Sequence, residues 1–173
     1  VMKALPQAHL KISAKTVVKL LSLFALSLTI ASAAGLFFKY FLGYDYVLGL
    51  VPQFDLNKEN NIPTWYATVT LLLCSVLLAV IATEKRTAHD RYARHWSVLS
   101  LIFLLLSMDE AASIHELIET IGERAGLHAG MFSYFWLIPG TVFVLIFAIS
   151  YLRFLFRLDP RTRYLFVAAG VVY

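Results

Sequence analysis

The 173-residue chain is strongly apolar: 60% of its residues are hydrophobic, 15% are charged, and the mean hydropathy is +0.72. Soluble domains average roughly 25% charged residues, so this composition excludes an ordinary soluble domain and indicates an integral membrane protein. The net charge of +4 does not suggest nucleic-acid binding, because the basic residues are scattered in short connections without an aromatic-lined groove. The single cysteine, Cys74, excludes an internal disulfide.

Apolar stretches of about 20 residues are needed for each membrane crossing. By that measure the sequence predicts an all-α, polytopic transmembrane helix bundle with four complete spans and the start of a fifth, at about 16–42, 64–83, 96–121, 131–152 and 164–173. The fifth stretch reaches Tyr173 after about half the length of a crossing. We therefore expect residues 1–173 to form a single transmembrane domain that is a fragment of a longer chain.

The basic residues are unevenly distributed over the connections, and this distribution predicts the topology, because cytoplasmic loops carry an excess of Lys and Arg. Three basic residues lie on the side predicted to be external, in loops 43–63 and 122–130 or next to them: Lys39, Lys58 and Arg124. Twelve lie on the other side, together with the N-terminus, which is therefore predicted to be cytoplasmic: Lys3, Lys11, Lys15, Lys19, Lys85, Arg86, Arg91, Arg94, Arg153, Arg157, Arg161 and Arg163. Residues of this kind also meet anionic lipid headgroups.

A run of polar and ionisable residues, from Ser107 to Glu119, continues directly from the third apolar stretch. Ionisable groups at membrane depth are costly unless they are paired, neutralised or facing water, so such a run is a functional-site hypothesis by default. If Trp96 marks the cytoplasmic interface, Asp109 lies about 20 Å into the bilayer. The sequence thus predicts a buried acidic cluster on the third helix, on a face that opens to the outer side.

Three chemical interpretations fit this run. In the first, a divalent metal is held by His115, Glu119 and His128, although the second histidine of a His-Glu-x-x-His motif is missing. In the second, carboxyl groups carry out acid–base catalysis or relay protons. In the third, which we favour, the carboxyl groups have a structural role and form hydrogen bonds with neighbouring helices. The candidate catalytic or relay residues are Asp109, Glu110, Ser113 and Glu116.

The outer loop contains a weaker motif. Asp55, Asn57 and Glu59 place oxygen ligands at alternate positions, as the first half of an EF-hand calcium loop does. The glycine at the sixth position and the glutamate at the twelfth are missing. A polar turn before Pro63, which suits the first turn of a helix, is the simpler interpretation.

Two segments carry a resemblance. Asn61-Ile62-Pro63-Thr64-Trp65, followed by the run Ser107 to Glu116, resembles a pattern found in a family of uncharacterised bacterial multipass membrane proteins. The resemblance covers roughly residues 45–120; it implies a location in the bacterial inner membrane and no particular activity. The membrane-embedded Ser, Asp and His residues are also similar to those of the ceramidase-like intramembrane hydrolases, which implies an alternative enzymatic function.

We therefore expect a non-catalytic accessory or scaffold subunit of a membrane complex. Its expected partners are the lipid bilayer and other membrane subunits, and no nucleic acid. The alternative is a metal-assisted or acid–base intramembrane hydrolase, or a proton or ion pathway, that opens to the outer side.

Overall fold

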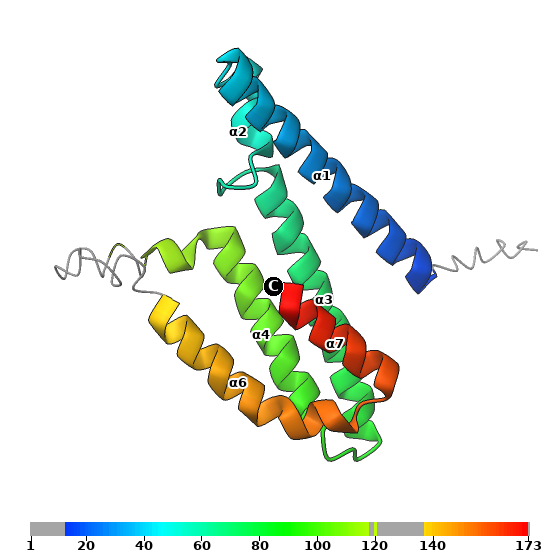
Figure 1. Cartoon of the computed structure of the whole chain (residues 1–173). Coiled ribbons are helices and arrows are strands. Elements are labelled where there is room, and N and C mark those ends of the chain that lie inside the picture. Colours follow the sequence, from blue (N-terminus) through cyan, green and yellow to red (C-terminus); the bar gives the residue numbers. More distant parts are fainter. Residues whose placement is uncertain (1–12, 118–119, 121–136, 173) are drawn as a thin grey trace, which may run out of the picture. The chain divides into compact units, whose positions relative to one another are not determined.

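The computed structural model describes residues 13–117, 120 and 137–172 (Figure 1). All elements formed by these residues are helical, which confirms the all-α prediction. In chain order they are α1 (Ala14–Leu42), the 3-10 helix η1 (Val47–Gly49), α2 (Leu50–Phe54), α3 (Ile62–Thr87), α4 (Ala93–Ala112), α6 (Leu137–Arg157) and α7 (Pro160–Val172).

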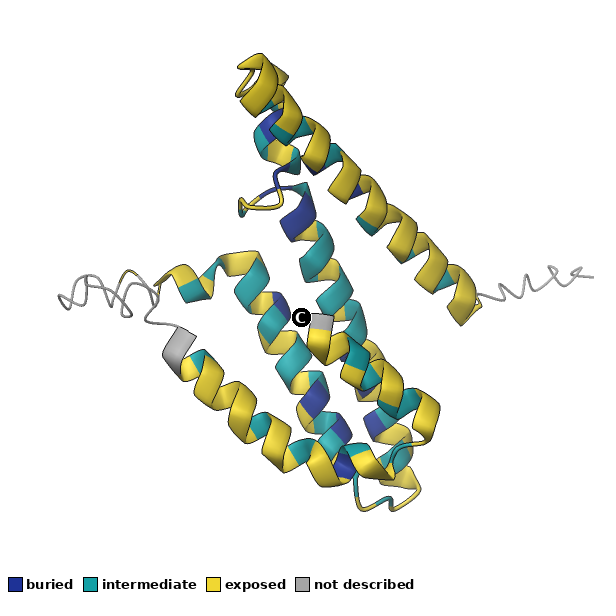
Figure 2. Ribbon diagram, viewed as in Figure 1, coloured by how far each residue is buried: buried dark blue, intermediate teal, exposed yellow. Residues whose placement is uncertain are grey.

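Four of the helices are long and apolar enough to cross a membrane: α1, α3, α4 and the Pro139–Arg157 part of α6. Most of their surface is exposed in the isolated chain, as the yellow ribbons of α1 and α6 show (Figure 2). Long helices with exposed apolar side chains are stable where lipid covers those side chains. The four helices therefore fit an integral membrane protein that contacts lipid.

The chain divides into two compact units, Val1–Tyr66 and Ala67–Tyr173. In the first unit the chain turns at Gly43, whose φ of 70° is readily adopted by glycine, and α2 returns against α1. Val51 of α2 is buried and approaches α1 at Gly35, where no side chain intervenes. The hydroxyl of Ser32, which is also buried, accepts the Leu56 backbone N–H at 3.1 Å. These contacts fix the start of the loop that precedes α3.

In the second unit, serine hydroxyls link α3 to α4. Ser75 Oγ donates to the Ser100 carbonyl at 2.8 Å, and Ser100 Oγ donates to the Ser75 carbonyl at 2.9 Å. Further along the same pair, the buried Ser107 donates to the Thr68 carbonyl at 2.9 Å. Small hydroxyl residues allow helix backbones to approach closely in membranes and form hydrogen bonds across the contact.

The other helices of the second unit pack through aromatic rings. Leu78 and Ala82 of α3, Trp96 and Leu99 of α4, and Phe154 of α6 form a buried cluster. The Trp96 ring meets Phe154 edge-on at 5.1 Å between centroids and Phe166 of α7 at 6.0 Å. Edge-to-face pairs of this kind are favourable beyond the area that they bury.

Candidate functional site

The acidic run lies where α4 ends, because the helix stops at Ala112. Ser113 adopts the left-handed conformation, with φ 48° and ψ 46°, and its N–H donates to the Asp109 carbonyl. This conformation costs a residue other than glycine roughly 1–2 kcal/mol, so it persists only where the surroundings stabilise it. The expected continuous helix from Trp96 to about Ile121 is thus interrupted, and its acidic stripe with it.

The Asp109 carboxylate supplies that stabilisation. Its Oδ1 accepts the His115 backbone N–H at 2.9 Å, and its Oδ2 lies 3.1 Å from His115 Nδ1. Both contacts join the last turn of α4 to the helical turn 114–117 beyond the break. Asp109 therefore holds the bend at Ser113 closed. When Nδ1 carries the proton it donates to the carboxylate, and His115 would then act as a base or ligand through Nε2.

The depth of Asp109 in the bilayer stays a prediction, because Trp96 and Asp109 both lie in α4 as expected. Twenty residues of helix span about 30 Å, which is the thickness of the hydrocarbon core. Asp109 belongs to the last turn of that helix, and its side chain is 36% exposed. In the isolated chain the Asp109 and Glu110 side chains are half-buried and Glu116 is exposed, and the buried acidic cluster on the third helix stays a prediction. The buried polar residue of this segment is Ser107.

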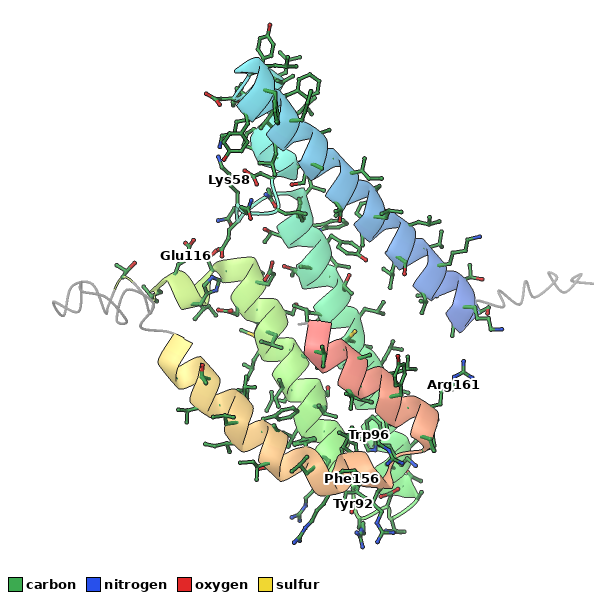
Figure 3. The ribbon with its side chains drawn as sticks, viewed as in Figure 1. Lys58, Tyr92, Trp96, Glu116, Phe156 and Arg161 are labelled. Carbon is green, nitrogen blue, oxygen red and sulfur yellow. The ribbon has the colours of Figure 1, made fainter. Side chains whose placement is uncertain are left out.

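The candidate catalytic residues come together only in part. Asp109 and Ser113 meet through the bend, and the Glu116 N–H donates to the Ser113 carbonyl at 3.2 Å. Glu116 lies at one end of the second unit, whereas Tyr92, Trp96 and Phe156 lie at the other (Figure 3). A polar site at one end of the unit is thus separated from an aromatic cluster at its opposite end, which consists of Tyr92, His95, Trp96, Tyr151 and Phe154.

Of the three proposed metal ligands, the structure describes one, His115. Glu119 and His128 lie outside the described residues, and His115 is engaged with Asp109. Over residues 13–117, 120 and 137–172, no three His, Cys, Asp or Glu side chains are grouped closely enough to hold a metal ion.

The expected calcium segment forms a turn. Asp55 is buried; its Oδ1 accepts the Asn57 N–H at 3.0 Å, and its carbonyl accepts the Lys58 N–H at 3.1 Å. An aspartate that binds the backbone two residues on makes an Asx turn. Glu59 is half-buried in the same turn.

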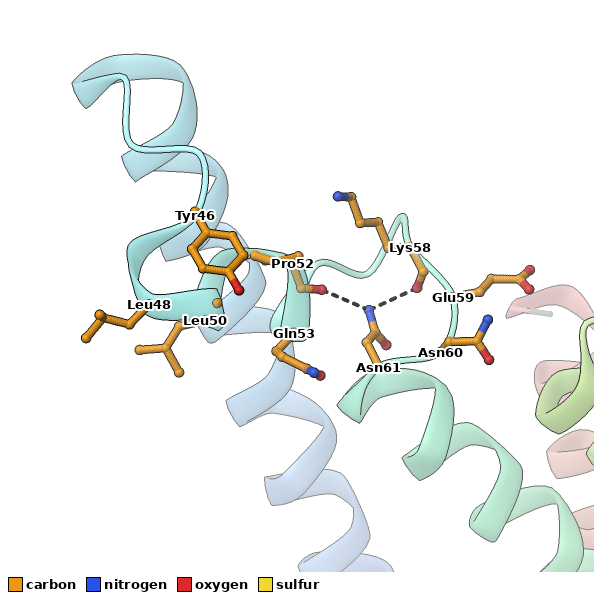
Figure 4. Close-up of a pocket in the computed structure, with 10 residues that line it drawn as sticks. Tyr46, Leu48, Leu50, Pro52, Gln53, Lys58, Glu59, Asn60 and Asn61 are labelled. Carbon is orange, nitrogen blue, oxygen red and sulfur yellow. Dashed lines mark hydrogen bonds between the residues drawn. The ribbon is translucent and has the colours of Figure 1, made fainter.

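Asn61 organises this turn, a role that its place in the motif Asn61–Trp65 did not indicate. Its side-chain amide donates to the carbonyls of Asp55 at 2.7 Å, Lys58 at 3.0 Å and Pro52 at 3.4 Å. Its Oδ1 accepts both the N–H and the hydroxyl of Thr64 at 3.1 Å, which caps the start of α3. A pocket of about 400 Å³ opens beside Asn61, between the turn 58–61 and η1 and α2 (Figure 4). Asparagine followed by Pro63 in the first helical turn is the sequence signal that identifies this cap.

His95 lies among the aromatic residues of the second unit. In the structure its ring stacks on Phe154 at 5.3 Å and meets Tyr151 edge-on at 5.3 Å. The Tyr151 hydroxyl donates to the His95 carbonyl at 2.9 Å, so α6 is tied to the first turn of α4. His95 thus belongs to the packed aromatic cluster.

Comparison with known proteins gives one match. Residues 15–173 match the model of a family described as a domain of unknown function (DUF8692), and the chain belongs to this family. No curated protein and no solved structure matches significantly. The expectation of an uncharacterised family is confirmed, and the match carries no activity with it.

Proposed function

We propose that this protein is a non-catalytic accessory or scaffold subunit of a membrane complex. The observation that carries the proposal is the use of the Asp109 carboxylate, which accepts the backbone N–H and meets the ring nitrogen of one residue, His115. These contacts close the bend after α4 and support a structural role for Asp109. The exposed apolar faces of the four long helices supply the lipid contact and leave surface for neighbouring subunits.

Amide variants test this proposal. Asp109→Asn keeps the shape of the side chain and an oxygen that can accept the His115 N–H, and Glu110→Gln is the matched change at the next position. Both variants should fold and should co-purify with the same membrane proteins as the wild-type chain. Loss of a function in cells by a well-folded amide variant would contradict the structural role.

We also propose that the N-terminus is cytoplasmic, which rests on the twelve-to-three distribution of basic residues. An impermeant thiol reagent applied to intact cells should label Asn57→Cys in the outer loop and spare Thr87→Cys at the end of α3; both positions are exposed. Asn57 is preferable to Asn60, whose φ of 58° suits asparagine better than cysteine. The wild-type chain, with only the half-buried Cys74, is the control. The reverse labelling pattern would overturn this topology.

A second candidate function is acid–base or metal-assisted hydrolysis, or proton relay. The pairing of Asp109 with His115 favours it, because a carboxylate that orients a histidine ring is a common arrangement in such sites. His115, Glu119 and His128 are the proposed metal ligands, and Asp55, Asn57 and Glu59 are weaker calcium candidates. Metal analysis of the purified full chain distinguishes these possibilities, since stoichiometric metal that is lost in His115→Ala would support this candidate over the scaffold.

A further inference from the structure

One end of the second unit carries a marked excess of positive charge. The connections α3–α4 and α6–α7 bring eight basic residues to this end: Lys85, Arg86, Arg91, Arg94, Arg153, Arg157, Arg161 and Arg163. Three acidic residues accompany them: Glu84, Asp90 and Asp159. Figure 3 shows Tyr92, Trp96 and Phe156 at this end and Arg161 at the start of α7, whereas Glu116 lies at the other end of the unit.

Two of those three carboxylates are already used locally. Asp90 accepts the Tyr92 N–H at 2.7 Å and lies 3.5 Å from the Lys85 ammonium. Asp159 accepts the Thr162 N–H at 3.0 Å and caps α7. Within the part of the chain that the structure describes, none of the arginines forms an ion pair with a carboxylate. Arg91 donates to the Tyr92 hydroxyl and Arg163 to the Leu158 carbonyl. Arg153, Arg157 and Arg161 are exposed, and their guanidinium groups can bind an external anion.

The aromatic cluster holds the arginines of both connections in one place. Tyr92 and Trp96, at the start of α4, pack against Phe154 at 5.7 Å and 5.1 Å between ring centroids. Phe154 follows Arg153 directly, so the end of α6 and the start of α4 are fixed to each other. The ring contacts thus join the helix ends that carry the exposed arginines.

We propose that this end of the second unit is a binding site for the phosphate headgroup of anionic phospholipids. Guanidinium groups bind phosphate oxygens in a bidentate geometry, and basic clusters beside membrane helices attract anionic headgroups. A lipid fits better than free phosphate because the apolar surface of α6 leads directly to Arg153 and Arg157. Ile149, Leu152 and Phe156 on that surface are 69%, 47% and 66% exposed and offer contact to an acyl chain.

Thermal unfolding of the full chain in detergent tests the site. Short-chain phosphatidylglycerol should raise the unfolding temperature in a saturable way, and short-chain phosphatidylcholine should not. The double variant Arg153→Gln/Arg157→Gln should bind phosphatidylglycerol roughly tenfold to thirtyfold more weakly, since each basic residue contributes modestly to such binding. Lys15→Gln/Lys19→Gln removes the same charge from exposed positions of α1 and should leave the affinity unchanged.

Three outcomes would overturn the proposal. Equal weakening by the two double variants would show attraction by net charge alone. Inorganic phosphate that stabilises the chain as well as phosphatidylglycerol would identify a phosphate site in place of a lipid site. Equal stabilisation of the wild-type chain by phosphatidylglycerol and phosphatidylcholine would show that the chain has no site for anionic headgroups. This measurement requires no variant.

Discussion

Asn61 in the first unit and Asp109 in the second perform related tasks in different surroundings. Each side chain satisfies backbone groups where a helix begins or ends. Asn61 is 9% exposed and forms five hydrogen bonds, to four residues. The Asp109 side chain is 36% exposed, and among the described residues its carboxylate meets the N–H and the ring nitrogen of His115.

The difference follows from charge. A neutral amide has both donors and acceptors, so it can be buried when all of them are satisfied. A carboxylate accepts only, and burying it is costly unless it is paired. Asn61 can therefore donate to the carbonyls of the buried turn, which a carboxylate could not do. Asp55, buried in the same turn, accepts the Asn57 N–H, and Asp109 accepts the His115 N–H at the half-exposed bend. Removing the Asn61 side chain should therefore lower the free energy of unfolding more than removing the Asp109 side chain does.

The largest effect is expected for Asn61→Ala. The change removes the cap of α3 and leaves the carbonyls of Asp55 and Lys58 without the amide, so unfolding should become easier by about 2–4 kcal/mol. Denaturation in detergent micelles measures this free energy. Asn61→Asp is the control: it keeps an acceptor for Thr64 but places negative charge against those carbonyls, and it should also be destabilising. If Asn61→Ala were as stable as the wild-type chain, the hydrogen bonds of Asn61 would contribute nothing to stability and the comparison with Asp109 would fail.

Asp109→Leu should have a smaller effect, a loss of about 1–3 kcal/mol in the same measurement, because the His115 N–H loses its acceptor. Asp109→Asn, which keeps an acceptor, should retain most of the stability. If the asparagine variant were as unstable as the leucine variant, charge and not hydrogen bonding would hold the bend at Ser113.

The hydrogen bonds between Ser75 of α3 and Ser100 of α4 join neutral groups and lie away from both the Asn61 turn and the Ser113 bend. Ser75→Ala should cost about 0.6 kcal/mol and at most about 1.7 kcal/mol, as is measured for hydrogen bonds between membrane helices. Thr83→Ala is a matched control, because its hydroxyl is exposed and bonds to the Ala79 carbonyl of its own helix. Equal effects of the two variants would show that the pair contributes nothing specific.

The smallest effect concerns the acid stability of α7. The Thr162 hydroxyl and N–H hold the pKa of Asp159 below its usual value, so the charged cap is stabilising above the unfolded pKa. That contribution should be lost as the pH falls through the folded pKa, in the region below about pH 4. Amide exchange of residues 161–164 should therefore quicken there in the wild-type chain. In Asp159→Asn, which keeps a neutral cap, this acceleration should be absent.

The sequence was sufficient to predict helices that are long and apolar enough to span a membrane, because the length of an apolar stretch and the absence of charge are local properties. Local signals also mark α7, which begins at Pro160 rather than near Tyr164: Asp159 is a favoured cap and Pro160 a favoured first residue. These signals lie in the connection and not in the apolar stretch from which the span was inferred.

The bend at Ser113 could not be predicted from such local signals. Ala111, Ala112 and Glu110 favour a continuing helix, and serine is not a typical residue for a left-handed conformation. The bend depends on two contacts between Asp109 and a residue six positions later, which helical periodicity does not anticipate. His95 is comparable, since its place among Phe154 and Tyr151 depends on a helix more than fifty residues away.

The reciprocal hydrogen bonds of Ser75 and Ser100 have a consequence for biogenesis. The connection 88–92 between α3 and α4 is short, and α4 is the least apolar of the four long helices. A helix of this kind inserts more readily when a partner is already present to receive its polar groups. We expect α3 and α4 to leave the translocon together as a hairpin. In a glycosylation-mapping assay, α4 should insert less efficiently after a polyleucine helix than after α3, and equal insertion would exclude this cooperation.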